Sequence, residues 1–298
     1  MTPTLPKVSQ QLYCRGQRVK LFRRKQKSDK RPIPRKHGGF TFDSDPSNGE
    51  ATSGKADEQT PVLRQKQSDK KLLPHLEPQQ FEVDQFKTLR TRILFPSSGK
   101  QPRSIAVTSA VPGEGKSFVA ANLAISIAQN IDKEQTLLVD CDMRLPSVHR
   151  IFGYEAVAGL SEYLSADAPL SDLLIRPRLI GNLSILPGGT PPENPAELLS
   201  SKKMLDLLKD VQSRYDDRYI IIDLPPPVLA AEANVIARAV DAVVVVVNYG
   251  HTSRSKVSEL IEMLGTDQVL GIVLNRFDTS MHSSAYRMYL KYIRRKEV

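Results

Sequence analysis

A glycine-rich loop between a short apolar segment and an alanine-rich segment constrains the fold of this chain more than any other feature. The apolar run at residues 104–109 predicts a buried strand, and the Ala-, Ile- and Leu-rich segment 117–129 predicts a helix. The connection reads Ala-Val-Pro-Gly-Glu-Gly-Lys and is followed by Ser117. It matches the phosphate-loop pattern from its last glycine onward, although Ala110 occupies the position where the first glycine is usual. The loop therefore predicts a site for the phosphates of a nucleotide, and a chance glycine turn is the weaker alternative.

Each residue type in this loop has a physical role at a phosphate site. Gly113 and Gly115 permit the backbone conformations that turn successive N–H groups toward an anion. The following helix directs the positive end of its dipole at the same point. Lys116 can reach the terminal phosphates, and the Ser117 hydroxyl can ligate magnesium. We expect the nucleotide to be bound by Pro112, Gly113, Glu114, Gly115, Lys116, Ser117 and Phe118.

Three carboxylates follow two other apolar segments. Asp140 and Asp142 are one residue apart, so in extended backbone they share a face and can point at one cation. Asp223 ends a second segment. Magnesium prefers oxygen ligands and keeps several waters, so Ser117, one acid and phosphate oxygens suffice to hold it. Each acid alone could be an ordinary residue at a strand end, but together with Lys116 they predict an ATP–magnesium site.

Apolar segments of strand length alternate with helical segments over most of the chain. The expected strands are 104–109, 136–140, 183–186, 219–223, 242–247 and 269–275, and the expected helices are 81–90, 117–129, 196–215, 230–239 and 255–264. This alternation predicts an α/β, P-loop NTPase fold, a mostly parallel sheet with helices on both faces. Ligands bind at the carboxyl ends of the strands in such sheets, and every motif above falls there.

The positive charge of the chain lies in its first segment. Residues 1–80 hold 17 Lys/Arg against 8 Asp/Glu, which accounts for the whole net charge of +9. Residues 1–78 contain few spaced apolar residues, so we expect a disordered basic arm. It is a solvated linker, or it binds anionic lipid head groups or nucleic-acid phosphate. The arm lacks interleaved aromatic residues, which argues against nucleic acid as a partner. A folded domain at 79–278 and a tail at 279–298 follow.

Cysteine usage and hydropathy bear on the compartment. Cys14 and Cys141 are too few and too far apart for a disulfide framework, which is typical of a reducing compartment. No apolar run reaches the roughly 18 residues of a membrane span, and the N-terminus lacks the apolar core of a secretory signal. We expect a cytoplasmic protein, and a peripheral position at the inner face of the cell membrane stays open.

These motifs together resemble those of the bacterial tyrosine autokinases (BY-kinases) of capsule and exopolysaccharide synthesis. The phosphate loop at 112–117, Asp-Cys-Asp-Met-Arg at 140–144 and Ile-Ile-Asp-Leu-Pro-Pro at 221–226 carry the resemblance. Further matching segments are Arg-Leu-Pro-Ser-Val-His (144–149), Gly-Leu-Ser-Glu-Tyr-Leu (159–164), Leu-Pro-Gly-Gly (186–189), Pro-Glu-Asn-Pro-Ala-Glu-Leu-Leu (192–199) and Val-Leu-Gly-Ile-Val-Leu-Asn (269–275). The resemblance covers about residues 80–276.

The resemblance implies an ATP- and Mg²⁺-dependent kinase that phosphorylates tyrosine. Lys116, Asp140 and Asp142 would be catalytic, with either acid promoting attack by a tyrosine hydroxyl of reference pKa about 10. The metal ligands would be Ser117, Asp142 and Asp223, and Asn275 would lie near the adenine. A separate membrane chain-length determinant, the polysaccharide co-polymerase, would activate the kinase, and the basic arm would hold it near anionic lipid.

Two other segments bear on self-association and on the phosphorylated tyrosines. The family's ring-forming Glu-x-x-Arg-x-x-Arg motif reads Asp84, Lys87 and Arg90 here, which keeps the charge signs with weaker partners. The alternative is a helix that packs on its own domain. Tyr286, Tyr289 and Tyr292 are expected autophosphorylation sites, spaced along one helical face. The alternative is an amphipathic basic helix that docks through those tyrosines, because the cluster is sparser than is typical of the family.

Two rival functions share the fold. A partitioning or positioning ATPase would dimerise on ATP and bind DNA or membrane. Many such ATPases carry a lysine near the start of the phosphate loop, and residues 108–113 contain none. A nucleotide-controlled scaffold would bind ATP without transferring a phosphoryl group, and the sparse tyrosine tail favours that alternative.

Overall fold

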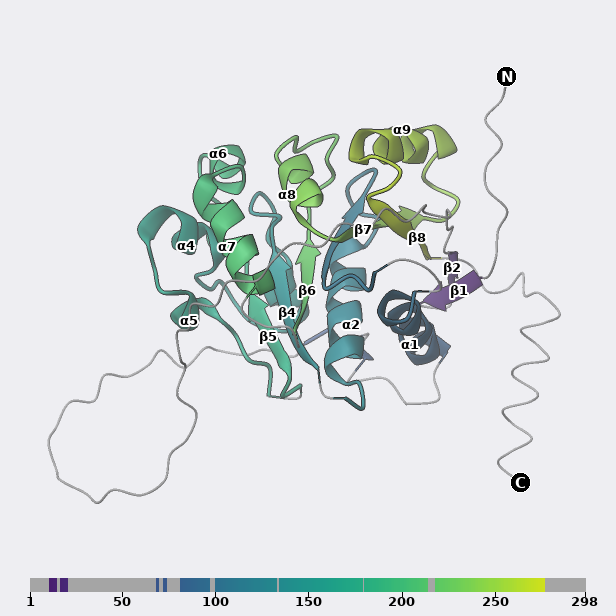
Figure 1. The fold of residues 1–298 in the computed structure, drawn as a ribbon, viewed down its shortest axis with the longest axis horizontal. Helices are drawn as coiled ribbons and strands as arrows, with labels where there is room; N and C mark the ends of the chain where they lie inside the picture. The colour runs from purple at the N-terminus through teal and green to yellow at the C-terminus, as the bar shows by residue number, and fades with distance from the viewer. Residues whose placement is uncertain are drawn as a thin grey trace, which may run out of the picture.

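The computed structural model describes residues 11–14, 17–20, 68–69, 72–73, 81–96 and 100–276, except 133, 179 and 214–217. Six strands form one parallel sheet in the order β5-β4-β6-β3-β7-β8 (Figure 1). They are β3 (Ser104–Ser109), β4 (Gln135–Asp140), β5 (Leu183–Leu186), β6 (Arg218–Asp223), β7 (Ala242–Asn248) and β8 (Val269–Asn275). The expected parallel α/β architecture is confirmed, and each strand begins within one residue of its predicted start.

Helices cover both faces of this sheet (Figure 1). One face packs against α1 (Phe81–Leu94), α2 (Lys116–Ala128) and α3 (Val148–Ile151). The other packs against α4 (Leu160–Ala166), α5 (Leu170–Leu173), α6 (Pro195–Leu199), α7 (Lys202–Ser213), α8 (Ala233–Ala239) and α9 (Arg254–Leu264). The central strands are therefore buried on both faces, which is why their sequences are continuous apolar runs rather than alternating ones.

Helix α2 is buried nearly all round. Of its 13 residues, all except Ser117 are buried. Its alanines, among them Ala120, Ala121 and Ala124, leave room for close contact with β3, β4 and β6. A helix that is apolar all round belongs in the interior of a domain. The burial fixes the N-terminus of α2, and with it Lys116, at the carboxyl edge of the sheet.

The structure differs from the sequence prediction at one helix and at several helix ends. The single helix expected at 196–215 is two helices, α6 and α7. The break falls at Ser200 and Ser201, where the Ser201 hydroxyl accepts a hydrogen bond from Met204 N at 3.1 Å and so caps α7. Helix α1 continues to Leu94, and α8 begins only at Ala233.

A few residues of the segment expected to be a disordered arm are among those that the structure describes. Leu72 and Leu73 are buried in the core beside α1 and α2. Leu73 N donates to Asn122 Oδ1 at 2.9 Å, and Asp69 N donates to Ile151 O at 2.9 Å. Strands β1 (Gln11–Cys14) and β2 (Gln17–Lys20) form an antiparallel hairpin that contacts α1 and β8. The rest of the basic arm lies outside the described residues. Within the described residues, no helix has the length and apolar character required to span a bilayer.

Candidate nucleotide site

The carboxyl ends of three neighbouring strands converge on Lys116. Parallel pairing places Asp140 of β4 opposite Asp223 of β6. Lys116 Nζ lies 2.7 Å from Asp142 Oδ2 and 3.4 Å from Asp223 Oδ1. It also lies 3.3 Å from the hydroxyl of Ser117. The sequence predicted that these residues gather at one edge of the sheet, and the structure brings them together.

Burial and charge act in opposite directions on Lys116. Burial lowers the pKa of its ammonium group, but Asp223 and Asp142 raise it more, so the pKa lies above its ordinary value. Lys116 is therefore charged, and it neutralises carboxylates that would otherwise be isolated inside the protein. Removing Lys116 from such a cluster is costly, because the buried carboxylates would then lack a counter-ion.

Asp140 has different neighbours from Asp142. Its Oδ1 accepts a hydrogen bond from Asp142 N at 3.1 Å. Its Oδ2 accepts from Ser147 N at 2.9 Å and Val148 N at 3.0 Å. Burial, followed by the charge of Asp223, raises the pKa of Asp140 to about 7 despite these bonds. Both oxygens of Asp140 thus hold the loop after β4 in place, whereas Asp142 accepts from Leu145 N through Oδ1 and pairs with Lys116 through Oδ2.

Asp223 is fully buried, and one of its oxygens has no partner. Its Oδ2 accepts no hydrogen bond from any residue that the structure describes. Burial raises the pKa of Asp223, while Lys116 and the Ser117 hydroxyl lower it. An orphaned buried carboxylate oxygen beside a serine hydroxyl is an arrangement that a cation or its bound water would satisfy.

The phosphate loop has the backbone conformation that its glycines predict. Gly113 has φ 79° and Gly115 has φ 89°, both in the left-handed region. At Gly115 a Cβ atom would also lie 2.2 Å from Asn275 Nδ2, so two independent constraints require glycine there. Among the described residues, no hydrogen bond uses the N–H of Gly113 or Gly115. Those donors remain for an anion.

Three residues predicted to bind the nucleotide have side chains engaged within the protein. The Glu114 carboxylate accepts hydrogen bonds from Val111 N and Asn248 N. The Phe118 ring packs against Phe86 in the core, with ring centroids 6.4 Å apart. Asn275 Nδ2 donates to Glu114 O at 2.7 Å, so Asn275 braces the loop. Contacts of these side chains with a nucleotide stay predictions.

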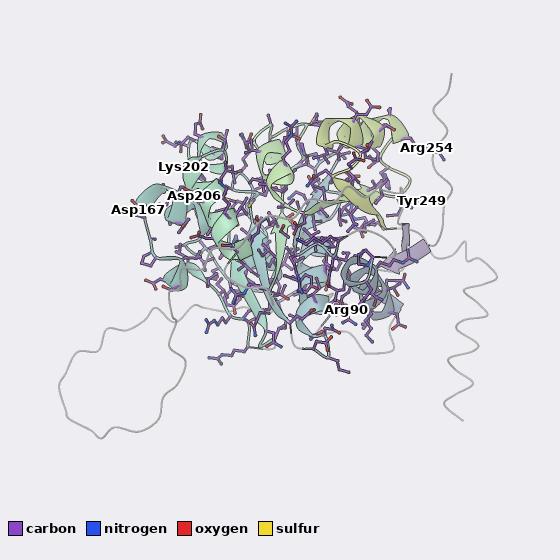
Figure 2. The ribbon with its side chains drawn as sticks, in the orientation of Figure 1. Arg90, Asp167, Lys202, Asp206, Tyr249 and Arg254 are labelled. Carbon is purple, nitrogen blue, oxygen red and sulfur yellow. The ribbon has the colours of Figure 1, made fainter. Side chains whose placement is uncertain are left out.

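Other expected residues lie away from the site or outside the described range. On α1, Lys87 Nζ lies 3.8 Å from Asp84 Oδ1, and Arg90 Nη1 donates to Ser126 O at 2.7 Å. Arg90, labelled in Figure 2, is therefore bound to its own domain, which supports the packing alternative for that residue. The three tail tyrosines lie outside the described residues.

Sequence reasoning missed an ion pair and three exposed apolar residues on the loops beside the site. Arg144 Nη2 lies 2.8 Å from Glu232 Oε1, which joins the loop after β4 to the loop after β6. The side chains of Leu145, Val228 and Leu229 on these loops are 72%, 49% and 63% exposed. Leu145 stands inside a motif used for the resemblance, but nothing in the sequence indicates which apolar residues of a loop face solvent.

The residues present fit magnesium held together with phosphates. Within the described part of the chain, no group of three His, Cys, Asp or Glu side chains is arranged to hold a metal ion. A complete protein shell is not needed, because Mg²⁺ keeps waters and takes phosphate oxygens as ligands. Ser117 and the free oxygen of Asp223 are the donors that fit it.

Comparison with known proteins defines the class first. Residues 105–298 match the family model of the CobQ/CobB/MinD/ParA nucleotide binding domain. The chain is therefore a nucleotide-binding P-loop domain of this class, in agreement with the parallel sheet and with the loop at the N-terminus of α2.

The particular family follows from curated and solved relatives. The chain is 37% identical over 209 residues to the tyrosine-protein kinase YwqD of Bacillus subtilis, covering 70% of this chain and 86% of that one. The crystal structure of the chimerical protein CapA2B2 is similar at 34% identity, with a TM-score of 0.63 over 73% of this chain and 94% of that one. The kinase domain of the Escherichia coli tyrosine kinase ETK gives 29% identity and a TM-score of 0.64, over 74% and 86%. The chain belongs to the bacterial tyrosine-protein kinases.

Proposed function

We propose that this chain is an ATP- and Mg²⁺-dependent protein tyrosine autokinase. It transfers the γ-phosphoryl group of ATP to tyrosine hydroxyls, including Tyr286, Tyr289 and Tyr292 of its own tail. The observation that carries the proposal is the buried ion pair of Lys116 with Asp142 and Asp223 at the mouth of the phosphate loop. Membership of the tyrosine-protein kinase family supports the choice of tyrosine as acceptor.

Lys116 and Asp142 form a pair that phosphate can separate. The phosphates of ATP compete for the ammonium group, which now lies 2.7 Å from Asp142 Oδ2. Once Lys116 turns to the phosphates, Asp142 is free to accept the proton of the attacking tyrosine hydroxyl. The new O–P bond forms as the bond from the γ-phosphorus to the leaving oxygen breaks, and ADP departs with that oxygen.

The other site residues have positioning roles in this scheme. Ser117 and Asp223 would hold Mg²⁺, which neutralises charge on the transferred phosphoryl group when bound. Asp140 orders the loop that carries Asp142, since both of its oxygens accept backbone N–H groups there. We therefore assign the role of base to Asp142 and not to Asp140, a choice that the residue spacing alone left open.

A polypeptide acceptor suits the surface beside the site. Leu145, Val228 and Leu229 are exposed apolar side chains on the two loops that follow Asp142 and Asp223. Water, the acceptor in simple ATP hydrolysis, needs no apolar contact, whereas a tyrosine-bearing segment does. These exposed residues support a protein substrate rather than a pure ATPase function.

The cellular context of the proposal comes from the family resemblance. The kinase would regulate polymerisation and export of a capsular or extracellular polysaccharide, together with a separate membrane chain-length determinant. It would lie in the cytoplasm at the inner face of the membrane, with the basic arm at 1–78 in contact with anionic lipid. Self-association, including a ring, belongs to the same proposal.

Mass spectrometry of the purified protein after incubation with Mg-ATP tests this function. Phosphate is expected on the tail tyrosines of the wild type and absent from Lys116→Met. Replacing Tyr286, Tyr289 and Tyr292 by Phe is expected to remove most phosphotyrosine and to leave ATP binding intact. Undiminished labelling of that triple variant would show that the acceptors lie elsewhere.

The rival ATPase makes a different prediction in the same experiment. Turnover of ATP without phosphotyrosine, in the presence of the activating membrane protein, would favour an ATPase or a nucleotide-controlled scaffold. DNA binding that weakens steeply with salt would favour the partitioning class in particular.

A further inference from the structure

Glu114 is a buried carboxylate inside the phosphate loop that also contacts the turn after β7. Its side chain is 1% exposed. Its Oε2 accepts from Val111 N at 2.9 Å, and its Oε1 accepts from Asn248 N at 2.8 Å and from the Thr252 hydroxyl. Tyr249, labelled in Figure 2, lies between Asn248 and Thr252 in the sequence and marks the turn from β7 to α9.

The backbone carbonyl of Glu114 also has a hydrogen-bond partner. Asn275 Nδ2, at the end of β8, donates to Glu114 O at 2.7 Å. Asn275 O accepts from Tyr249 N at 3.0 Å, which closes the connection between β8 and the turn after β7. Glu114, in the middle of the phosphate loop, is therefore hydrogen-bonded through its carboxylate to the end of β7 and through its carbonyl oxygen to the end of β8.

A carboxylate at this point needs a physical reason. A buried negative charge is unfavourable without strong partners, and this one lies in a loop whose proposed ligand is an anion. Three hydrogen bonds to one ionised group are charge-assisted and correspondingly strong. None of them uses the N–H groups of Gly113 and Gly115, which remain without protein partners among the described residues.

We infer that Glu114 is a positioning residue that holds the phosphate loop in its nucleotide-binding conformation through Asn248 and Thr252. The inference rests on the proposed function, because it assumes that this loop binds the phosphates of ATP. A loop ordered in advance loses less conformational entropy on binding. The hydrogen bonds of the Glu114 carboxylate to Asn248 N and the Thr252 hydroxyl, called the tether below, therefore increase nucleotide affinity. The Thr252 hydroxyl is the one partner in this tether that a side-chain substitution removes cleanly.

The test is the affinity of the purified full chain for Mg-ADP, measured by isothermal titration calorimetry. Thr252→Val replaces the hydroxyl with a methyl group of similar size and is expected to weaken binding by as much as about tenfold, because the nucleotide must then order a loop that has lost one hydrogen bond to a charged group. Thr252→Ser keeps the hydroxyl and is expected to restore most of the affinity. Thr91→Val is the matched control, because the Thr91 hydroxyl donates to Lys87 O on the exposed side of α1.

Melting temperatures without nucleotide separate positioning from simple stabilisation. If Thr252→Val only lowers the melting temperature and binds Mg-ADP as tightly as the wild type, the inference is wrong. Glu114→Gln supplies a second variant, because one of its two terminal atoms becomes a donor facing a donor. It is expected to weaken binding more than Thr252→Val, and equal or tighter binding would overturn the inference.

The outcomes also distinguish the inference from the proposed function. A wild-type chain that binds no Mg-ADP would contradict the proposed function at its first step and remove the basis of the tether. Normal binding by the wild type with no difference between the Val and Ser variants at position 252 would refute the tether alone.

Discussion

Substitution of Lys116 by methionine removes the cation from a buried cluster of carboxylates. Among the described residues, Lys116 is the one cation paired with Asp142 and Asp223, and its side chain is only 9% exposed. Lys116→Met is expected to abolish phosphotransfer, because nothing replaces the ammonium at the phosphates. It is also expected to destabilise the fold, because two carboxylates lose their counter-ion.

The size of that effect follows from the burial of the pair. Breaking a buried ion pair by removing one partner costs about 3–5 kcal/mol. For a folded domain of this size, about 4 kcal/mol corresponds to a fall in melting temperature of roughly 10 °C. Loss of activity in Lys116→Met therefore has to be separated from loss of folded protein.

A double-mutant cycle with Asp223→Asn makes the separation. Burial holds the pKa of Asp223 above its ordinary value, so its ionised form is less stable in the folded chain than in the unfolded chain. Asp223→Asn is thus expected to leave the melting temperature unchanged or to raise it, while phosphotransfer is lost. In the Lys116→Met background the same change is expected to recover about 1 kcal/mol or more, the size of a coupling between groups in contact.

Thermal unfolding of the four proteins, followed by circular dichroism without nucleotide, measures the cycle. Independent effects of the two substitutions, with no coupling between them, would refute the electrostatic account of the cluster. A Lys116→Met protein that melts with the wild type would do the same. Phosphotransfer retained by either single variant would instead contradict the assignment of the site.

Three further predictions rest on single contacts. Asn122→Ala leaves Leu73 N without its buried acceptor and is expected to cost about 1–3 kcal/mol by thermal unfolding; unchanged stability would mean that residue 73 is not held there. In Gly115→Ala the alanine would have to adopt φ 89° and would place its methyl group 2.2 Å from Asn275 Nδ2. The variant is therefore expected to lose binding of Mg-ADP in calorimetry. Retained affinity would contradict the loop geometry. Burial raises the pKa of Glu162, but hydrogen bonds from Gly159 N and Thr190 N lower it more. The ionised Glu162 side chain therefore stabilises the fold at neutral pH, and this stabilisation is lost as the pH falls below 4.5. Glu162→Gln is accordingly expected to be about 1 kcal/mol less stable than the wild type at neutral pH, with a gap that closes in acid, and a gap independent of pH would refute this.

The sheet and the central site follow from local signals that the sequence carries openly. Mostly apolar runs of four to seven residues are long enough to identify buried strands, and each ends at a change to polar residues or to proline. Parallel topology then brings Lys116, Asp142 and Asp223 together without any further information, because the carboxyl ends of all strands share one edge.

Contacts between distant loops could not be predicted in the same way. The hydrogen bonds of Glu114 to Asn248 N and the Thr252 hydroxyl join residues more than 130 positions apart. Nothing in the composition of either loop indicates that contact. The break between α6 and α7 was missed because Ser200 and Ser201 are tolerated inside helices, and only the cap formed by the Ser201 hydroxyl distinguishes the two cases.

The contrast between Asp140 and Asp142 shows what backbone geometry adds to a motif. One residue apart on a strand end, the two acids are equivalent in sequence terms. The chain turns immediately after β4, so the N–H groups of Ser147 and Val148 return to Asp140 and occupy it. Asp142 pairs with Lys116, and that pair determines the order of nucleotide binding and proton transfer at the site. The proposed base is bound to a cation until phosphate oxygens take the lysine, so deprotonation of an acceptor tyrosine depends on nucleotide having bound first.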